Sequence, residues 1–209
     1  MLTRKKTQVV VFDCDGVLFD SRTANTHFYN HILARFGLPP MNAHEAAYAH
    51  MHTADESIRH LFQQSEHLEE ALAFRWAMDY SPFIRDMIME PGLSEVLSCL
   101  SCNTGLAVAT NRSNTIHDVL EHNRLDSFFD LVVSSLDVRR PKPHPEPLFK
   151  IMAHFEVAPE NVLYVGDSQV DAQTAQGAGV PFIAYKDPGL PAQYHVEDLW
   201  EVAAIALSE

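Results

Sequence analysis

The sequence has few cysteines, few basic residues and no long hydrophobic run. Its three cysteines, Cys14, Cys99 and Cys102, cannot all pair within one chain, so a disulfide framework is excluded and reduced thiols are expected. Cys99 and Cys102 have the spacing of a redox or zinc motif, but no second cysteine pair completes a tetrahedral zinc site. Both lie in an apolar helical pattern, which favours packing as their role.

Positive charge is scarce as well. The chain of 209 residues has 15 Lys and Arg against 28 Asp and Glu, a formal net charge of -13. This balance argues against nucleic acid or an anionic membrane as a partner, and a phosphate ligand needs cations placed locally. The first apolar run covers only residues 9–12, which is too short for a signal peptide or a membrane span. We expect a cytoplasmic protein, and a monomer or weak homodimer.

Residues 23–80 contain no convincing strand. Apolar residues recur at helical spacing from Phe28 to Phe36, and Thr53-x-x-Glu56 fits a capping box at the start of a later helix. The pattern predicts a helical insert with its own small core.

Outside this insert, short apolar strands alternate with helices. Strands are expected at residues 9–12, 106–110, 131–133, 162–165 and 181–185. Helices are expected at about 93–102, 114–122, 146–155, 170–177 and 196–207. Apolar strands that alternate with helices predict an α/β fold, in which a parallel sheet has helices on both faces.

Two carboxylates end the first of these strands. Asp13 and Asp15 are two residues apart, with Gly16 directly after them. Side chains at this spacing point the same way, and two carboxylates repel unless a cation or a shared proton lies between them. The pair predicts a magnesium site with Asp13 free to attack an electrophile, although Asp and Gly after a strand are also ordinary turn residues.

The next polar strand ends suit a phosphate. Thr110 and Asn111 follow a strand and precede a helix, where a hydroxyl and backbone N–H groups can meet phosphoryl oxygens. Lys142 is held between two prolines in a stiff loop, which can place one ammonium beside a phosphate and a nucleophilic carboxylate. A helix cap and a rigid surface loop are the structural alternatives.

A last pair of acids follows the strand at 162–165. Asp167 and Asp171 flank the start of a helix and can add oxygen ligands to a metal already touched by Asp13 and Asp15. Carboxyl ends of parallel strands meet at one edge of a sheet, so all four strand ends are expected to face the same crevice.

Taken together, these motifs resemble the haloacid dehalogenase-like hydrolase superfamily, in its phosphoglycolate phosphatase-like branch. The matching motifs are Asp13-x-Asp15-Gly-Val-Leu, Thr110-Asn111, Lys142 in Lys-Pro-His-Pro-Glu-Pro, and Gly166-Asp167-x-x-x-Asp171. The resemblance implies a Rossmann-like core of residues 1–20 and 82–209, with residues 21–81 as a mobile helical cap.

The resemblance also implies roles for single residues. It makes Asp13 the nucleophile that becomes an aspartyl phosphate, and Asp15 the acid that protonates the leaving oxygen and later deprotonates water. The residues it implies for catalysis and phosphate binding are Asp13, Asp15, Thr110, Asn111 and Lys142. Those it implies for Mg²⁺ are Asp13, Asp15 through its main-chain carbonyl, Asp167, and Asp171 in a supporting role.

The expected function is a magnesium-dependent phosphatase that acts on a small phosphorylated metabolite. Because members that act on carbon–halogen bonds typically lack the second aspartate of the first motif, Asp15 favours phosphoryl transfer. A sugar phosphomutase and a catalytically inactive binding or regulatory member remain as alternatives. Candidates in the insert to meet a leaving group are Arg22, Asn25, His27 and Tyr29. His27 and His31 have the spacing of two metal ligands on one helix face, but no carboxylate or cysteine completes such a site.

Overall fold

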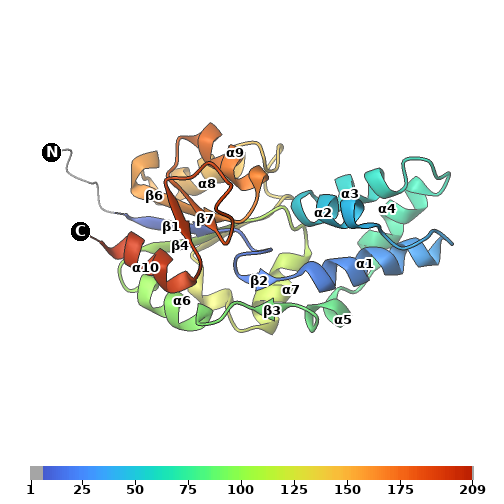
Figure 1. Cartoon of the computed structure of the whole chain (residues 1–209), viewed down its shortest axis with the longest axis horizontal. Helices are drawn as coiled ribbons and strands as arrows, with labels where there is room; N and C mark the ends of the chain where they lie inside the picture. Colours follow the sequence, from blue (N-terminus) through green and yellow to red (C-terminus); the bar gives the residue numbers. More distant parts are fainter. Residues whose placement is uncertain (1–6, 209) are drawn as a thin grey trace.

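Two regions lie along the long axis of the molecule in a computed structural model of the chain (Figure 1). A sheet with its flanking helices forms one end, and five helices that follow the first strands form most of the other end. The structure describes residues 7–208; residues 1–6 and 209, which the sequence analysis included in the core, lie outside the described residues. None of the described helices is long and apolar enough to cross a membrane.

Within the described residues, the main sheet has six strands in the order β5-β4-β1-β6-β7-β8. The strands are β1 (Val9–Phe12), β4 (Gly105–Ala109), β5 (Leu131–Val133), β6 (Val162–Gly166), β7 (Phe182–Tyr185) and β8 (Tyr194–Val196). Neighbouring strands are parallel throughout, and Val9 of β1 pairs with both Gly105 and Val162. This register brings the ends of β1, β4 and β6 to the same edge of the sheet.

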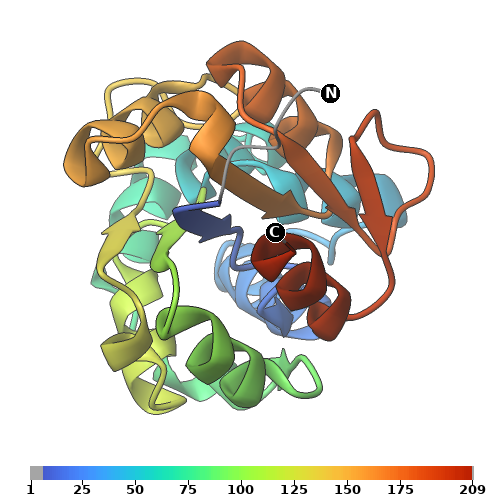
Figure 2. The same cartoon turned by 90° about the vertical axis from the view of Figure 1, so that its left-hand side faces the viewer.

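Alternate residues of β1 face two different layers of helices. Val10 and Phe12 belong to a core cluster shared with α6 (Leu93–Ser101), α7 (Thr115–His122) and α10 (Leu199–Leu207). Val9 and Val11 belong to a second cluster with α8 (Glu146–Phe155) and α9 (Gln169–Ala178). Figure 2 shows these helices on opposite sides of the sheet. The sequence-based expectation of an α/β sheet with helices on both faces is confirmed.

The helical insertion lies between β2 (Phe19–Asp20) and β3 (Ile88–Met89). Its helices are α1 (Arg22–Arg35), α2 (Ala43–Met51), α3 (Ala54–Leu61), α4 (Leu68–Ala77) and α5 (Ser81–Ile84). Thr53 and Glu56 form the expected capping box, and Asn42 and Glu45 form another before α2, a helix that the sequence analysis missed. The sequence predicted a separate small core for the insertion, and this prediction is wrong. The buried residues of the insertion join the cluster on the α6 face of the sheet.

The crossing between sheet and insertion is a small antiparallel ribbon. Strands β2 (Phe19–Asp20) and β3 (Ile88–Met89) pair with each other, so the chain leaves the sheet and returns to it at adjacent points. Strands of two residues are too short to show a hydrophobic period, which is why the sequence did not predict them.

The sequence-based prediction is also wrong at the sheet edge formed by β8. It placed Val196 at the start of the last helix, whereas this residue ends a strand that pairs with β7. The helix α10 begins three residues later, because the Asp198 side chain accepts hydrogen bonds from the N–H groups of Trp200 at 2.8 Å and Glu201 at 3.1 Å.

Candidate active site

Asp13 lies at the end of β1, directly beside the ammonium group of Lys142. Its Oδ1 is 2.8 Å from Lys142 Nζ and accepts a hydrogen bond from the Cys14 N–H at 2.7 Å. Asp13 and Lys142 are both buried. Burial raises the pKa of Asp13 to about 8, because Lys142 offsets the loss of hydration only in part and nearby carboxylates, first Asp171, raise it further.

Lys142 is held from its other side by two buried groups. Its Nζ donates to Asp171 Oδ1 at 2.7 Å and to the Tyr164 hydroxyl at 3.0 Å, and that hydroxyl donates to Asp171 Oδ1 at 2.5 Å. The second oxygen of Asp171 accepts from Ser168. Burial alone lowers the pKa of Lys142, but the charges of Asp13 and then Asp171 together raise it by more. The net pKa is above its ordinary value, so the lysine stays charged.

Asp15 has a different environment although it is only two residues away. Arg112 donates to both of its oxygens, with Nε at 2.8 Å from Oδ2 and Nη2 at 2.7 Å from Oδ1, and Ser21 donates to Oδ1 as well. Burial raises the pKa of Asp15, but the charge and hydrogen bonds of Arg112, with smaller contributions from His50 and Ser21, together outweigh it and leave the pKa below its ordinary value. The two acids of the first motif are therefore shifted in opposite directions.

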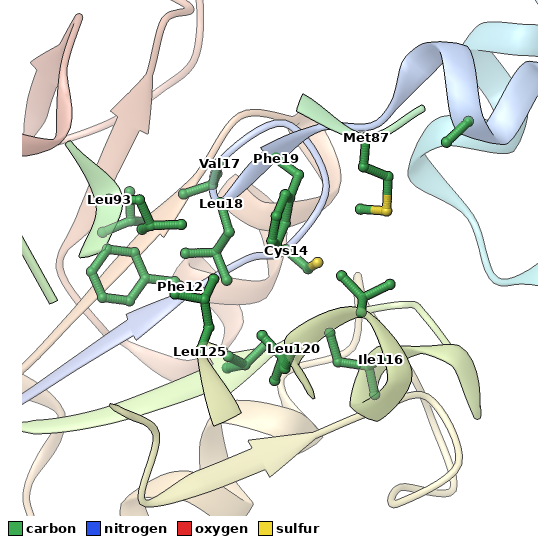
Figure 3. Close-up of a cluster of buried hydrophobic side chains, with 14 of the residues drawn as sticks. Phe12, Cys14, Val17, Leu18, Phe19, Met87, Leu93, Ile116, Leu120 and Leu125 are labelled. Carbon is green, nitrogen blue, oxygen red and sulfur yellow. The ribbon is translucent and has the colours of Figure 1, made fainter. Parts of the chain in front are cut away.

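Cys14, between these acids, points away from them. Its side chain lies in an apolar cluster with Phe19, Met87 and Ile116 (Figure 3). Burial, followed by the charge of Asp15, raises the pKa of this thiol well above its ordinary value. Cys14 therefore packs as a small apolar residue. Of the other two cysteines, Cys102 is exposed, which contradicts the expectation that it packs.

Two glycines let the acids come together. Gly16 has φ of +79°, and a Cβ there would lie 1.9 Å from Asp167 Oδ2. A Cβ at Gly166 would lie 2.4 Å from the Cβ of Asp171. Larger residues at either position would displace an acidic side chain, so both glycines maintain the geometry of the carboxylate cluster.

Three carboxylates are close enough to share one cation. Ligand atoms of Asp13, Asp167 and Asp171 all lie within 4.8 Å of one another. Burial is the main cause that raises the pKa of Asp167. Oxygen donors that repel one another in a buried cluster fit Mg²⁺, a hard cation. The Asp15 side chain is outside this group because it pairs with Arg112.

Thr110 and Asn111 are brought to the same place. The Thr110 hydroxyl accepts a hydrogen bond from the Arg112 N–H at 3.1 Å. Asn111 Nδ2 donates to the carbonyl of Lys142 at 3.1 Å and to that of Met51 in the insertion at 3.0 Å. Asn111 therefore links the lysine loop to the insertion.

The sheet edge and the insertion enclose a cavity of about 50 Å³, the junction cavity. On the sheet side its lining includes Asp13, Asp15, Thr110, Asn111, Arg112, Ser113, Lys142 and Asp167. On the insertion side it includes Asn25, Tyr29, His50, Arg75 and Tyr80. The structure thus brings together the sequence-predicted residues of the sheet side, with Asp171 buried behind Lys142.

Sequence reasoning missed several residues of this site. Arg112, Ser21, His50 and Arg75 were not singled out for the contacts they make here. Only the position of Arg112, directly after the Thr110-Asn111 motif, gave a signal. Of the insert candidates, Asn25 and Tyr29 line the cavity, whereas His27 contacts Asp86 at 2.8 Å. Among the described residues, neither His27 nor His31 belongs to a group that could hold a metal ion.

Comparison with known proteins identifies a family. A family model described as haloacid dehalogenase-like hydrolase matches residues 10–185. The crystal structure of a HAD-superfamily hydrolase of subfamily IA, variant 1, from Geobacter sulfurreducens PCA has 42% sequence identity and a TM-score of 0.78 and covers 96% of each chain.

Several curated relatives carry the name phosphoglycolate phosphatase, among them the following two. The protein from Rhodobacter capsulatus is 28% identical over 185 residues, which are 85% of this chain and 84% of that protein. The protein from Salmonella choleraesuis is 34% identical over 121 residues, 57% of this chain. The chain spans 44% of the length of the Salmonella protein, less than half.

Proposed function

This chain belongs to the haloacid dehalogenase-like hydrolase family, and we propose that it is a magnesium-dependent phosphatase for a small phosphorylated metabolite. The reaction passes through an aspartyl phosphate on Asp13. The observation that carries the proposal is the buried Asp13 carboxylate, 2.8 Å from Lys142 Nζ at the edge of a cluster of acids. The phosphatase names of the two curated relatives support the same reaction class.

Each step uses a group of the chain. Asp13 attacks the phosphorus atom, and Lys142 neutralises charge on the transferred phosphoryl group. Asp15, which must first take up a proton when the substrate is bound, gives it to the leaving oxygen and then regains one from the water that hydrolyses the aspartyl phosphate. Thr110 and Asn111 hold phosphoryl oxygens.

The acidic cluster is proposed to hold the cation. Asp13, Asp167 and the main-chain carbonyl of Asp15 would be its ligands, and Asp171, whose two oxygens already accept hydrogen bonds, supports Lys142 instead. When bound, Mg²⁺ supplies positive charge that favours the ionised form of Asp13 and stabilises the developing charge on the phosphoryl oxygens.

Residues 21–81 are proposed as a cap that closes over the site, with the core formed by the remaining residues. Support comes from the junction cavity, which is lined by both regions, and from the hydrogen bond between Asn111 and the Met51 carbonyl. A cap of this kind excludes water from the aspartyl phosphate until the leaving group has departed.

Phosphate release from a panel of phosphate esters tests the proposal. We expect hydrolysis with Mg²⁺ present and loss of hydrolysis in excess chelator, restored by added Mg²⁺. A purified chain that is inert towards the panel and towards acetyl phosphate contradicts the proposal and favours a binding or regulatory role. Conversion of a sugar monophosphate into its isomer without free phosphate indicates a phosphomutase.

A further inference from the structure

Three buried polar side-chain atoms have no hydrogen-bond partner among the described residues. They are His50 Nε2, Arg75 Nε and Asn111 Oδ1. All three residues line the junction cavity. An unpaired buried polar atom costs free energy, so these atoms need partners from within the cavity, from ordered water or from a polar ligand. Arg75 Nε needs an acceptor, whereas Asn111 Oδ1 needs a donor.

Arg75 is the charged member of this group, and it comes from the insertion. Its side chain is only 3% exposed. Nη1 donates to the Ser113 hydroxyl at 3.2 Å and Nη2 donates to Asp55 at 2.5 Å, so Nε is left over. Ser113 follows the Thr110-Asn111 motif, which places this guanidinium next to the proposed phosphate-binding loop.

Within the insertion, the Arg75 guanidinium contacts the Trp76 ring, whose centroid is 4.0 Å from Cζ, and the carboxylate of Asp55, and neither pairs with Nε. The Asp55 side chain is 45% exposed, so solvent screens its charge, whereas the guanidinium is buried. A second buried guanidinium, that of Arg112, lines the same cavity, but it donates to both oxygens of Asp15. Unlike Arg112 and Lys142, Arg75 is therefore paired with an acid that lies nearly half in solvent.

We propose that Arg75 is a specificity-determining residue whose guanidinium binds an acidic group on the leaving group of the substrate. The inference rests on the proposed phosphatase function. The acidic group is a carboxylate or a second phosphoryl group, since both present oxygens that match the fork of a guanidinium. The transferred phosphoryl group lies at Asp13 and Lys142, and the acidic group extends towards the insertion.

The alternative is that Arg75 only joins the insertion to the sheet through Asp55 and Ser113. A purely structural arginine affects all ligands alike. A specificity-determining arginine affects ligands with an acidic group far more than neutral ligands of the same length.

Binding of inert phosphonates separates these two roles. Phosphonopropionate and hydroxypropylphosphonate have the same chain length, but only the first carries a carboxylate; methylenediphosphonate supplies the second phosphoryl group. Calorimetry with Mg²⁺ present gives the dissociation constants for the wild type, Arg75→Met, Arg75→Lys and Arg59→Met. Arg59 is an exposed arginine of α3, so its variant controls for the loss of one positive charge.

We expect the wild type to bind at least one acidic ligand about tenfold or more tightly than the neutral one. Arg75→Met should abolish this preference, and Arg75→Lys should retain part of it because an ammonium lacks the fork. Arg59→Met should keep it in full. The acidic ligand that is preferred identifies the source of the charge as carboxylate or phosphoryl.

Four results overturn the inference: no preference in the wild type, a preference that survives in Arg75→Met, an equal loss of affinity for acidic and neutral ligands, or no binding of any ligand. Circular dichroism checks that each variant folds. If Arg75→Met does not fold, the loss of preference is measured with Arg75→Lys instead. Because the ligands are inert, binding through Arg75 without hydrolysis of any ester contradicts the proposed function alone. Hydrolysis of hydroxyethyl phosphate as fast as phosphoglycolate, with no binding preference, contradicts this inference alone.

Discussion

The sheet side and the insertion side of the junction cavity are built differently. On the sheet side, Lys142 already contacts Asp13 and Asp171, and Asp15 already contacts Arg112. On the insertion side, Arg75 keeps a buried nitrogen without a hydrogen-bond partner among the described residues. His50 does so too, with Nε2 at 3.8 Å from the nearest oxygen of Asp167.

This difference matches the two tasks of the proposed enzyme. The transferred phosphoryl group is common to all substrates, so the groups that stabilise it can be fixed in advance by contacts within the protein. The leaving group varies, and a site that recognises it keeps polar atoms free for it. Asn111 has both features. Its Nδ2 donates hydrogen bonds to the sheet side and to the insertion side of the cavity, whereas its Oδ1 has no partner among the described residues.

The largest expected effect is on the sheet side, at Asp13. Asp13→Asn should abolish turnover, because an amide is a poor nucleophile and no aspartyl phosphate can form. Phosphate release and acid-stable labelling by a radioactive ester measure the loss. Asp118→Asn, at an exposed acid of α7, is the matched control and should behave like the wild type. Label trapped on the Asp13 variant would show that the nucleophile lies elsewhere.

Asp15→Asn should have the next largest effect, and one that depends on the substrate. The variant loses proton delivery to the leaving oxygen, a contribution of about 100-fold to 10,000-fold for an alkyl phosphate. An aryl phosphate, whose leaving group departs without protonation, should be affected much less in the first step. Quench-flow labelling should show aspartyl phosphate that forms from the aryl ester and then hydrolyses slowly. Equal losses for both esters would contradict the acid role.

Lys142→Ala should lower turnover by about 100-fold or more, because one preformed electrostatic stabiliser is lost. The change also leaves Asp13 and Asp171 without their shared cation. Steady-state kinetics with circular dichroism as a folding check measure the effect. Arg140→Ala, at an exposed residue of the same loop, is the control. A near-normal rate for Lys142→Ala would leave the loop with a structural role only, and the contrast between the two sides of the cavity would disappear.

Most of the sheet side could be predicted from the sequence. Carboxyl ends of parallel strands share an edge, so polar residues after the strands of Asp13, Thr110 and Asp167 had to lie close together. The partner of Asp15 could not be predicted this way. Arg112 is 97 residues away, and its choice of partner depends on how the helix after β4 is placed against β1.

The insertion side was almost wholly missed. Arg75 and Ser113 are 38 residues apart in different regions, and only the placement of the insertion over the sheet edge brings them together. A buried arginine on a helix has the same sequence pattern as a solvated one. Helical periodicity predicted the existence of the insert but not which of its polar residues face the cavity.

The smallest expected effect is on stability, and it tests whether the carboxylate cluster is the cation site. Burial raises the pKa of Asp13 from 3.8 to about 8. Without a cation, the contribution of this group to stability is complete below its unfolded pKa and is lost as the pH rises through the folded pKa. Mg²⁺ binds the ionised form, so at low pH it must first displace a proton. The increase in Tm caused by a fixed Mg²⁺ concentration should therefore be larger at about pH 8.5 than at about pH 6.

Protonation of His50 also makes the increase in Tm caused by Mg²⁺ smaller at low pH, so the effect of His50 has to be separated from that of Asp13. Burial lowers the pKa of His50, but Asp167 and then Asp15 raise it above its ordinary value, so a protonated His50 opposes a cation at low pH. Differential scanning fluorimetry of the wild type, His50→Gln and Asp167→Asn separates the two. If Asp13 is the source, the dependence of the Tm increase on pH persists in His50→Gln. Asp167→Asn should reduce the increase at every pH, because a proposed ligand is lost. An increase in Tm that is the same at both pH values would show that the cation binds away from Asp13.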